Sequence, residues 1–456
     1  MFISLIYALS IMVMMLPLNI FATYSTNNIL TCYNQLIKQY KLPNNRNNIN
    51  IIQQGVTTLT NNYSAEYIST IMHRIQTLDI CSMDNPPHNA DDVKVHILSN
   101  IFQVVDAHTQ WMPINQTNNF KNLLSGTDSK LGFTIVLKNN YMIVDHIDNN
   151  YNNNILLKPN DKILSINNTN VTLIPDLFIL DTILRPEINT FNLVVERNHK
   201  KHNIVVKRSQ EKNSTVYHHK LGLYDYINIS LFNNNTPQEF KDVITKLNSK
   251  NTNGIVLDLR NNPGGVISSV VSIIDMLISE GNMVNINSLS GDNNETYKAS
   301  KKTYLDGNIP ILVVINHNTA SAAEILSLAL QTNNRAMIFG ERSFGKGTMQ
   351  DILQLSDGSA VKITNKLYTV SGISPQVYGV QPNISTVSSQ RIDMLLHREK
   401  KLYLHLKNPT QEAYNKYKTQ IQVNHISTSN CGTRYNKNLD QDINCAIYYI
   451  QKAVSR

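Results

Sequence analysis

The sequence predicts a multidomain fold with an α/β core, helical segments at both ends and a β-rich domain inserted before the core. Two patterns predict the core. Residues 254–259 and 310–316 are short and almost wholly apolar, as expected of buried strands, and a polar loop at 260–265 leads into an apolar helical pattern at 266–279. Strand, loop, helix and strand in this order indicate a βαβ unit, whose functional residues are expected at the carboxyl ends of the strands.

The N-terminal region, residues 23–125, is predicted to be helical. Apolar residues recur there three or four positions apart, as Ile68 and Ile71 do. The region ends close to Asp106 and His108, whose spacing has two interpretations. The two side chains could form a catalytic pair, or Asp106 could brace the turn at the end of a helix. The second is the commoner use of this pattern and the one we favour.

The middle region, residues 126–208, alternates apolar and polar residues in the manner of strands. The order of its predicted strands and one short helix resembles a PDZ domain. Leu131, Gly132 and Phe133 stand where PDZ domains carry the loop whose backbone N–H groups hold the terminal carboxylate of a peptide. Residues 158–168 resemble the turn and strand of the same domain, with asparagines in place of its glycines. The resemblance implies a peptide-binding domain.

The first 22 residues are apolar and give way to a polar stretch, as in a secretory signal peptide. An uncleaved membrane anchor is the alternative, because the first 20 residues contain no lysine or arginine. Either interpretation predicts an exported protein, in a periplasm or another extracytoplasmic space, tethered to a membrane only if this segment is retained. In an oxidising compartment we favour two local disulfides, Cys32–Cys81 and Cys431–Cys445, over four free thiols.

Charge and cysteine spacing argue against two other classes of protein. The net charge of +8 is modest for 456 residues, and the basic residues are dispersed, so we favour a solvated surface over nucleic-acid binding. The cysteines form no C-x-x-C pair and no histidine cluster accompanies them, so we expect no metal site. No cofactor is expected, and the sequence predicts no oligomeric state.

A serine and a lysine carry the most informative chemistry of the chain. Ser321 lies in a run of small residues, 319–324, at the start of an apolar helical pattern, and Lys346 lies between Gly345 and Gly347. A serine becomes a nucleophile when a base takes its proton, and a lysine can be that base when burial lowers its pKa. The pair therefore predicts a serine–lysine hydrolase.

Three further interpretations compete with this one. A serine among alanines commonly just packs a helix, and a lysine in a glycine turn is commonly exposed. The spacing of Gly340, Gly345 and Lys346 also mimics a nucleotide-binding phosphate loop, but Gly347 stands where that loop needs a serine or threonine for magnesium. The remaining alternative is a catalytically inactive, PDZ-bearing scaffold that only binds peptides.

Several phrases, in order along the chain, resemble those of the C-terminal processing peptidases, also called tail-specific proteases. Outside the PDZ-like region these phrases are residues 105–113, 258–265, 319–324, 340–350, 357–364, 368–382 and 398–408. Each phrase alone is weak evidence, but their common order is specific, and the resemblance covers the chain from about residue 27 to its end. It implies a ClpP/crotonase-like peptidase core at 209–385 and a helical C-terminal segment at 386–456.

The resemblance also implies roles for individual residues. Ser321 would be the nucleophile, Lys346 the general base and Gln350 the residue that orients the lysine. Backbone N–H groups of Ala322 and of the loop formed by Gly264 and Gly265 would form the oxyanion hole. We therefore expect a serine endopeptidase that recognises the free C-terminal region of exported polypeptides and cleaves near it.

Overall fold

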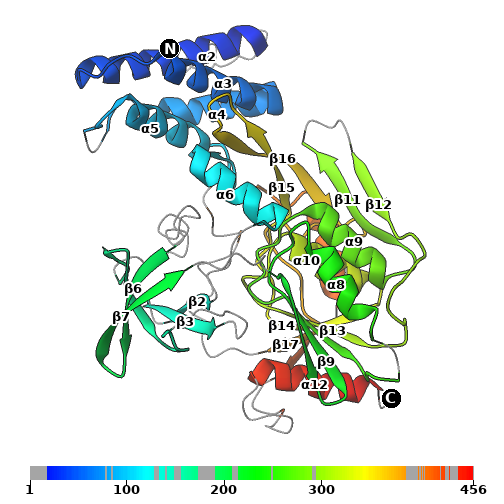
Figure 1. Ribbon diagram of the computed structural model, residues 1–456. Helices are drawn as coiled ribbons and strands as arrows, with labels where there is room; N and C mark the ends of the chain where they lie inside the picture. Colours follow the sequence, from blue (N-terminus) through cyan, green and yellow to red (C-terminus); the bar gives the residue numbers. More distant parts are fainter. Residues whose placement is uncertain are drawn as a thin grey trace. The chain divides into compact units, whose positions relative to one another are not determined.

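The chain divides into two compact units, drawn together in Figure 1. The first combines Met1–Thr117 with Thr215–Arg456, and the second is Asn118–Ser214, which encloses the predicted PDZ-like range. The computed structural model describes residues 18–77, 80–83, 86–127, 133–138, 141–147, 156–172, 190–207, 214–247, 250–289, 294–386, 399, 402, 404, 406–421, 423–426, 431 and 440–454.

A mostly parallel sheet forms the centre of the first unit. Its strand order is β18-β17-β14-β13-β10-β9-β8, and all neighbours are parallel except β8 and β9. The strands are β8 (Val216–Leu221), β9 (Tyr224–Ile229), β10 (Ile255–Asp258), β13 (Ile311–Ile315), β14 (Ala336–Gly340), β17 (Ile384–Thr386) and β18 (Asn424–Ile426). The two predicted buried strands are β10 and β13, and every residue of both is buried. The predicted α/β core is confirmed.

Helices cover both faces of this sheet because the apolar residues of the buried strands alternate between the faces. Ile255 and Leu257 of β10 belong to the same apolar cluster as the helices α8 (Thr236–Ile244), α9 (Ile267–Leu277) and α10 (Ala322–Thr332). Val256, between them, belongs to a second cluster with α12 (Gln441–Val454). α9 is the helix predicted after the polar loop.

A second sheet of the first unit connects the core to the N-terminal helices. β16 (Ala360–Thr369) pairs with β1 (Gln110–Met112), β11 (Asn282–Ser288) and β15 (Thr348–Gln354), and β11 also pairs with β12 (Glu295–Lys298). All these pairings are antiparallel. Residues 23–125 therefore contain one short strand besides their predicted helices, and this strand joins the sheet that carries Gln350.

The N-terminal helices are α2 (Leu18–Gln39), α3 (Arg46–Asn62), α4 (Ala65–Thr77), α5 (Ala90–Gln103) and α6 (Ile114–Ser125). The apolar faces of α2 to α5 share one core with Val361 and Ile363 of β16. At about 25 cal/mol per Å² of buried apolar surface, this shared core contributes to the stability of both the helices and the second sheet. Within the described part of the chain, no helix is both long and apolar enough to cross a membrane.

The second unit is an antiparallel sheet with the strand order β2-β3-β4-β6-β7, and β5 pairs with β4. Its strands are β2 (Phe133–Lys138), β3 (Tyr141–Ile147), β4 (Lys162–Ile166), β5 (Thr169–Asn170), β6 (Thr190–Arg197) and β7 (Lys200–Lys207). Phe133 begins β2 and is buried in the apolar core of this unit. Leu131, Gly132 and the predicted short helix lie outside the described residues.

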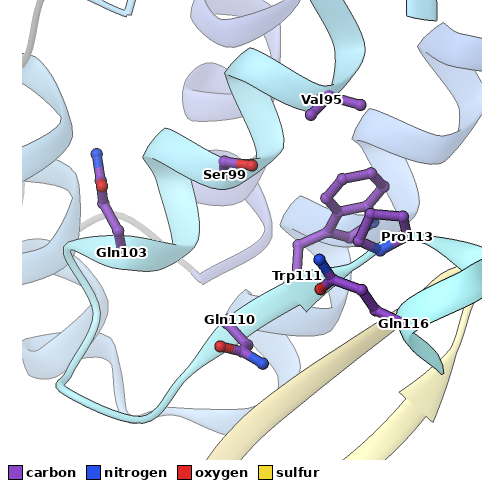
Figure 2. A pocket seen from close by; sticks show the side chains of 7 residues that line it. All are labelled: Val95, Ser99, Gln103, Gln110, Trp111, Pro113 and Gln116. Atoms are coloured by element: carbon purple, nitrogen blue, oxygen red, sulfur yellow. The ribbon is translucent and has the colours of Figure 1, made fainter. Parts of the chain in front are cut away.

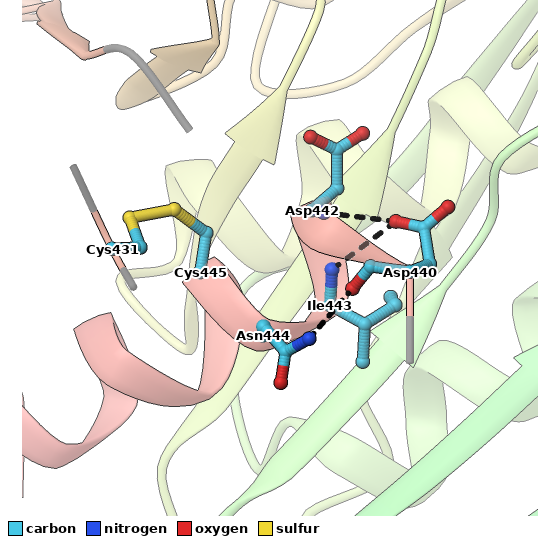
Figure 3. Close-up of a disulfide and its surroundings, with 6 residues drawn as sticks. All are labelled: Cys431, Asp440, Asp442, Ile443, Asn444 and Cys445. Carbon is cyan, nitrogen blue, oxygen red and sulfur yellow. Dashed lines mark hydrogen bonds between the residues drawn. A yellow bond between two sulfur atoms is a disulfide. The ribbon is translucent and has the colours of Figure 1, made fainter. Parts of the chain in front are cut away.

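Both predicted disulfides are confirmed. Cys32 of α2 is bonded to Cys81, and Cys431 is bonded to Cys445 of α12, as Figure 3 shows for the second pair. Residues 386–456 contain α11 (Gln411–Gln420), α12 and the strand β18, so this segment contributes a strand as well as helices to the first unit. The second disulfide ties Cys431 to α12, and this helix packs on β10 and β13.

Candidate active site

Ser321 lies between the carboxyl end of β13 and the first residue of α10. Its backbone has φ 54° and ψ −118°, a conformation that costs a residue other than glycine on the order of 1–3 kcal/mol. Its side chain is largely buried. Such strain persists only where surrounding contacts impose it, and it is common at functional sites.

The loop after β10 packs directly against this serine. Gly264 has φ 104°, and a Cβ built on it would lie 2.7 Å from the Cβ of Ser321 and 2.9 Å from the nitrogen of Ala322. Only glycine fits this position. The N–H of Gly264 donates to Oδ1 of Asn262 at 2.8 Å, so this N–H is engaged within the loop. The structure therefore brings Gly264 close to Ser321 and Ala322.

Lys346 precedes β15 and reaches Gln350, which lies within that strand. Lys346 Nζ donates to Oε1 of Gln350 at 2.7 Å. Burial lowers the pKa of Lys346, while the carboxylates of Glu399, Glu324 and Asp106 act in the opposite direction. A lysine whose pKa is lowered is neutral in a larger fraction of molecules, which is the form that can accept a proton.

Glu324, in the first turn of α10, joins the serine segment to the lysine segment. Its fully buried Oε2 accepts the N–H of Ser321 at 2.9 Å and the N–H of Lys346 at 2.8 Å. Its Oε1 accepts the N–H of Gly345 at 2.7 Å and the hydroxyl of Ser343. The backbone nitrogens of Ser321 and Lys346 are thus no farther apart than the sum of the first two distances.

A buried tyrosine makes a second connection between these segments. The hydroxyl of Tyr368 lies 2.6 Å from the carbonyl oxygen of Lys346 and 3.2 Å from that of Ser321. Among the described residues, no hydrogen bond joins Oγ of Ser321 to Nζ of Lys346. The structure therefore brings the two segments together, while the two reacting atoms are not bonded to each other.

Comparison with known proteins agrees with this geometry. Residues 224–386 match the family model described as peptidase family S41. This segment therefore resembles members of peptidase family S41. It contains Ser321, Lys346, Gln350 and the loop around Gly264, so the predicted resemblance to the C-terminal processing peptidases is confirmed.

Curated relatives of the chain include two peptidases from different organisms. The chain is 38% identical over 160 residues to "C-terminal processing peptidase, chloroplastic" of Tetradesmus obliquus, which is 35% of this chain and 34% of the relative. It is 25% identical over 286 residues to "Probable CtpA-like serine protease" of Staphylococcus epidermidis, 62% of this chain and 58% of the relative. In both cases the match spans less than two thirds of the relative.

A solved structure shares the fold. The "photosystem II D1 C-terminal processing protease" superposes with a TM-score of 0.51 and 21% sequence identity, covering 75% of this chain and 93% of the other. At this identity the match is evidence for the fold alone. The S41 segment and the mixed α/β architecture around it are therefore supported by both sequence and structure.

Asp106 and His108 lie outside the S41 segment. Among the described residues, no hydrogen bond joins their two side chains, so they do not form the catalytic pair that was considered. Asp106 Oδ1 accepts the backbone N–H groups of His108 at 2.8 Å and of Thr109 at 3.0 Å, which confirms that it braces a turn. Nε2 of His108 lies 2.6 Å from Oε2 of the buried Glu399. Glu399 was not singled out from the sequence; its only signal was its place in the resembling phrase at 398–408.

The Glu399 carboxylate is connected to the lysine segment by the side chain of Gln376. Its Oε1 accepts from Nε2 of Gln376 at 2.8 Å, and Oε1 of Gln376 accepts the N–H of Gly347 at 2.6 Å. A Cβ on Gly347 would lie 2.6 Å from Oγ of Ser374, so glycine is required for this close approach. The lysine turn is thus held by residues from the C-terminal part of the S41 segment and beyond it.

The loop that carries Gly264 is also attached to the C-terminal helix. Nη2 of Arg260 lies 2.8 Å from Oδ2 of Asp258, and its Nη1 lies 3.0 Å from Oδ1 of Asp440. Figure 3 shows Asp440 at the start of α12, where its Oδ1 also accepts the N–H of Asp442. The end of β10 and the start of α12 are therefore connected by charged groups.

A surface pocket of about 310 Å³ lies elsewhere in the first unit, between α5 and β1 (Figure 2). It is lined by Val95, Ser99, Gln103, Gln110, Trp111, Pro113 and Gln116. The lining contains no acidic, basic or histidine side chain, so no base is available there to activate Ser99. In the described residues, no group of three or more histidine, cysteine, aspartate or glutamate side chains is arranged to hold a metal ion.

Proposed function

We propose that the protein is a serine endopeptidase in which Ser321 is the nucleophile, Lys346 the general base and Gln350 the residue that orients the lysine. The observation that carries this proposal is the junction at Glu324, whose one carboxylate oxygen accepts N–H groups from both Ser321 and Lys346. The match of residues 224–386 to the model of peptidase family S41 supports the same reaction class.

The reaction follows from the chemistry of the pair. Neutral Lys346 takes the proton of the Ser321 hydroxyl as Oγ attacks the carbonyl carbon of the scissile peptide bond. The ammonium of Lys346 then gives this proton to the leaving amine, and an ester remains on Ser321. A water molecule deprotonated by Lys346 attacks the ester. The carboxyl product then leaves, and the ammonium of Lys346 returns the proton to Oγ of Ser321, which restores the free serine and the neutral lysine. Burial favours the neutral lysine because it lowers the pKa of Lys346.

The oxyanion of the tetrahedral intermediate needs donors beside Ser321. Ala322 supplies the N–H at the start of α10, where the helix dipole also favours negative charge. Because the N–H of Gly264 is bound to Asn262, the N–H of Gly265 would be the donor from the facing loop. A donor of this kind contributes about 3 kcal/mol to transition-state stabilisation.

We further propose that the second unit is PDZ-like and captures the free C-terminal end of the substrate near Leu131, Gly132 and Phe133. β2, which begins at Phe133, is an edge strand of its sheet within the described residues, and an edge strand can pair with an added peptide. The similarity to the C-terminal processing peptidase of Tetradesmus obliquus supports this substrate class. The core would be ClpP/crotonase-like, and the two disulfides support an extracytoplasmic location.

The decisive experiment compares four proteins on one unfolded protein substrate, with products read by mass spectrometry. Wild type is expected to cleave, and Ser321→Ala and Lys346→Ala are expected to lose cleavage while keeping the fold. Ser272→Ala, on the exposed face of α9, is the matched serine control. Cleavage by Ser321→Ala would overturn the assignment, and a wild type that binds peptides without cleaving them would indicate the scaffold instead.

Recognition of the C-terminal end has its own test. The same substrate is prepared with a free or an amidated terminus, and cleavage rates are compared. Amidation removes the carboxylate that the PDZ-like loop would bind, so the amidated substrate is expected to be cleaved more slowly. Equal rates would remove the proposed role of Leu131, Gly132 and Phe133.

A further inference from the structure

A continuous chain of hydrogen bonds extends from Lys346 to the N-terminal region. Lys346 Nζ donates to Oε1 of Gln350 at 2.7 Å. Nε2 of Gln350 donates to the hydroxyls of Thr364 and Thr348, each at 3.1 Å. The hydroxyl of Thr364 in turn donates to Oδ1 of Asp106 at 2.9 Å. Every residue in this series of hydrogen bonds lies in the first unit.

Asp106, at the far end of this series, fixes which atom donates in each of its hydrogen bonds. The other described partners of the Asp106 carboxylate, the N–H groups of His108 and Thr109 and the hydroxyls of Thr109 and Tyr63, can all donate to it. A carboxylate accepts only, so the single hydroxyl proton of Thr364 points to Asp106. The lone pairs of Thr364 Oγ1 then face Gln350, and they require the NH₂ side of its amide.

This direction decides which way the Gln350 amide faces. An amide has its donor nitrogen and its acceptor oxygen on opposite sides, and the two orientations fill nearly the same volume. With Nε2 held by Thr364 and Thr348, Oε1 must face Lys346. Without that constraint the amide could turn and present its NH₂ group to the lysine, which would not hold an ammonium.

The anchor is rigid enough to impose this choice. Asp106 and Thr364 are buried, and the backbone N–H of Thr364 donates to Oγ1 of Thr109 at 2.9 Å. Tyr63, at the end of α3, donates to Oδ2 of Asp106 at 3.2 Å. The end of α3 and the strand β16 therefore meet at Asp106.

We propose that Asp106 and Thr364 are positioning residues for Lys346, which act through Gln350 by fixing the orientation of its amide. The N-terminal region thereby completes the lysine site, although it lies outside the S41 segment. This inference rests on the proposed function of Lys346 as the general base. It assigns Asp106 a task beyond bracing its own turn.

The test replaces Thr364 by valine, which has nearly the same shape and no hydroxyl, and by serine, which keeps the hydroxyl. In the full-length protein, Thr364→Val is expected to lower kcat about tenfold or more with little change in KM, because a misplaced base slows only the chemical step. Thr364→Ser is expected to stay within about threefold of wild type. Thr369→Val, the same change at a buried position of the same strand, is the matched control.

A second readout separates positioning from mere stability. The Lys346–Gln350 bond favours the ammonium, so its loss lowers the pKa of Lys346 and moves the acidic limb of the pH–rate profile to lower pH. The other charged groups around this lysine are Glu324, Glu399 and Lys362, which all variants keep. Asp106→Asn is expected to move the limb further, because it also removes a carboxylate that raises the pKa of Lys346.

A labelling measurement keeps the proposal testable without turnover. In the Ser321→Ala background, acetic anhydride labelling of Lys346 is followed against pH by mass spectrometry. A lower midpoint in Thr364→Val and Asp106→Asn, with Thr369→Val unchanged, supports positioning. Unchanged midpoints, or equal losses of kcat in Thr364→Ser and Thr364→Val, overturn it. The proposed function is decided separately, by wild type against Ser321→Ala.

Discussion

The serine and the lysine of this site are held by two different kinds of contact. Ser321 directly precedes α10, in the loop after β13, and Gly264 in the loop after the neighbouring strand β10 packs against it. Lys346 lies in a turn that is held by two series of hydrogen bonds. One series leads to Asp106 and the other leads to Glu399. The serine is thus placed by adjacent strands of one βαβ unit. The lysine is placed by residues that lie before and after the S41 segment in the sequence.

We call the surroundings of Ser321 the serine half of the site and those of Lys346 the lysine half. The difference between them indicates which substitutions each half tolerates. The serine half depends on close backbone packing, in which a single added carbon is too much. The lysine half depends on hydrogen bonds and charge, which set the orientation and the pKa of one amine. Substitutions should therefore act sharply on the first half and gradually on the second.

The largest effect is expected for Gly264→Ala. The new Cβ would lie 2.7 Å from Cβ of Ser321, and φ 104° is unfavourable for alanine, so Ser321 must move. A shift of about 1 Å in a reacting group can cost about 100-fold in rate, and kcat/KM should fall by that order. Gly307→Ala is the control, because nothing lies within 4 Å of its added Cβ. Equal activity of the two variants would contradict the tight packing of the serine half.

Glu324→Gln should damage both halves at once. An amide offers one acceptor oxygen where the carboxylate accepts four donors, and its NH₂ would face N–H groups. A buried donor that loses its partner costs about 1–3 kcal/mol, so both the free energy of unfolding and kcat should drop. The measurement is chemical denaturation beside the cleavage assay, with the exposed Glu412→Gln as control. Wild-type kcat in Glu324→Gln would break the proposed connection between the halves.

The same residue predicts a dependence of stability on pH. Burial raises the pKa of Glu324 from 4.5 to about 7. Between these values the native state holds a proton that the unfolded state has lost, so this residue's contribution is full below about pH 4.5. It is lost as pH rises through about 7, by up to about 3 kcal/mol. The difference in the free energy of unfolding between wild type and Glu324→Gln should therefore become smaller as pH rises. A difference that does not change with pH would contradict the raised pKa of Glu324.

A smaller effect is expected for Glu399→Gln, which changes charge in the lysine half. The Glu399 carboxylate raises the pKa of Lys346, so its removal should lower that pKa and move the acidic limb of the pH–rate profile to lower pH. Because glutamine can still accept from Gln376, kcat on the plateau should change only a few-fold. A limb that stays in place or moves to higher pH would contradict this role of the Glu399 carboxylate.

The smallest effect is expected for Asp440→Asn, at the attachment of α12 to the loop. Asp440 is about half exposed, and Arg260 keeps its contact to the more buried Asp258. Partly exposed ion pairs contribute about 0–1 kcal/mol, so thermal unfolding should shift by only a few degrees and kcat/KM should stay near wild type. A loss approaching that of Gly264→Ala would mean that the C-terminal helix controls the position of the serine.

The two halves also differ in how far the sequence predicts them. Ser321 and the loop around Gly264 follow from apolar runs and glycines within one βαβ unit, where pattern and spacing are informative. Glu324 could have been found as well, because it stands three residues after Ser321 at the spacing of a capping box.

The lysine half could be predicted only in part. Gln350 was assigned from the family resemblance, whereas Thr364, Gln376 and Glu399 were not singled out. Thr364 meets Asp106 across 258 positions of sequence, and His108 meets Glu399 across 291. No local periodicity reports a contact over such a separation, since it depends on how β1 and β16 pair in the folded chain.

The pairing of β1 with β16 has a consequence for the order in which this protein can be made. The hydrogen bond between Thr109 and Thr364 joins residues 255 positions apart. At roughly 5–20 residues per second, a ribosome needs roughly 10–50 seconds to add that stretch of chain. During this interval the N-terminal helices lack the apolar surface of Val361 and Ile363 that later covers them. A nascent chain of this protein therefore presents an uncovered helical surface, and its lysine site is assembled only after Glu399 has been added.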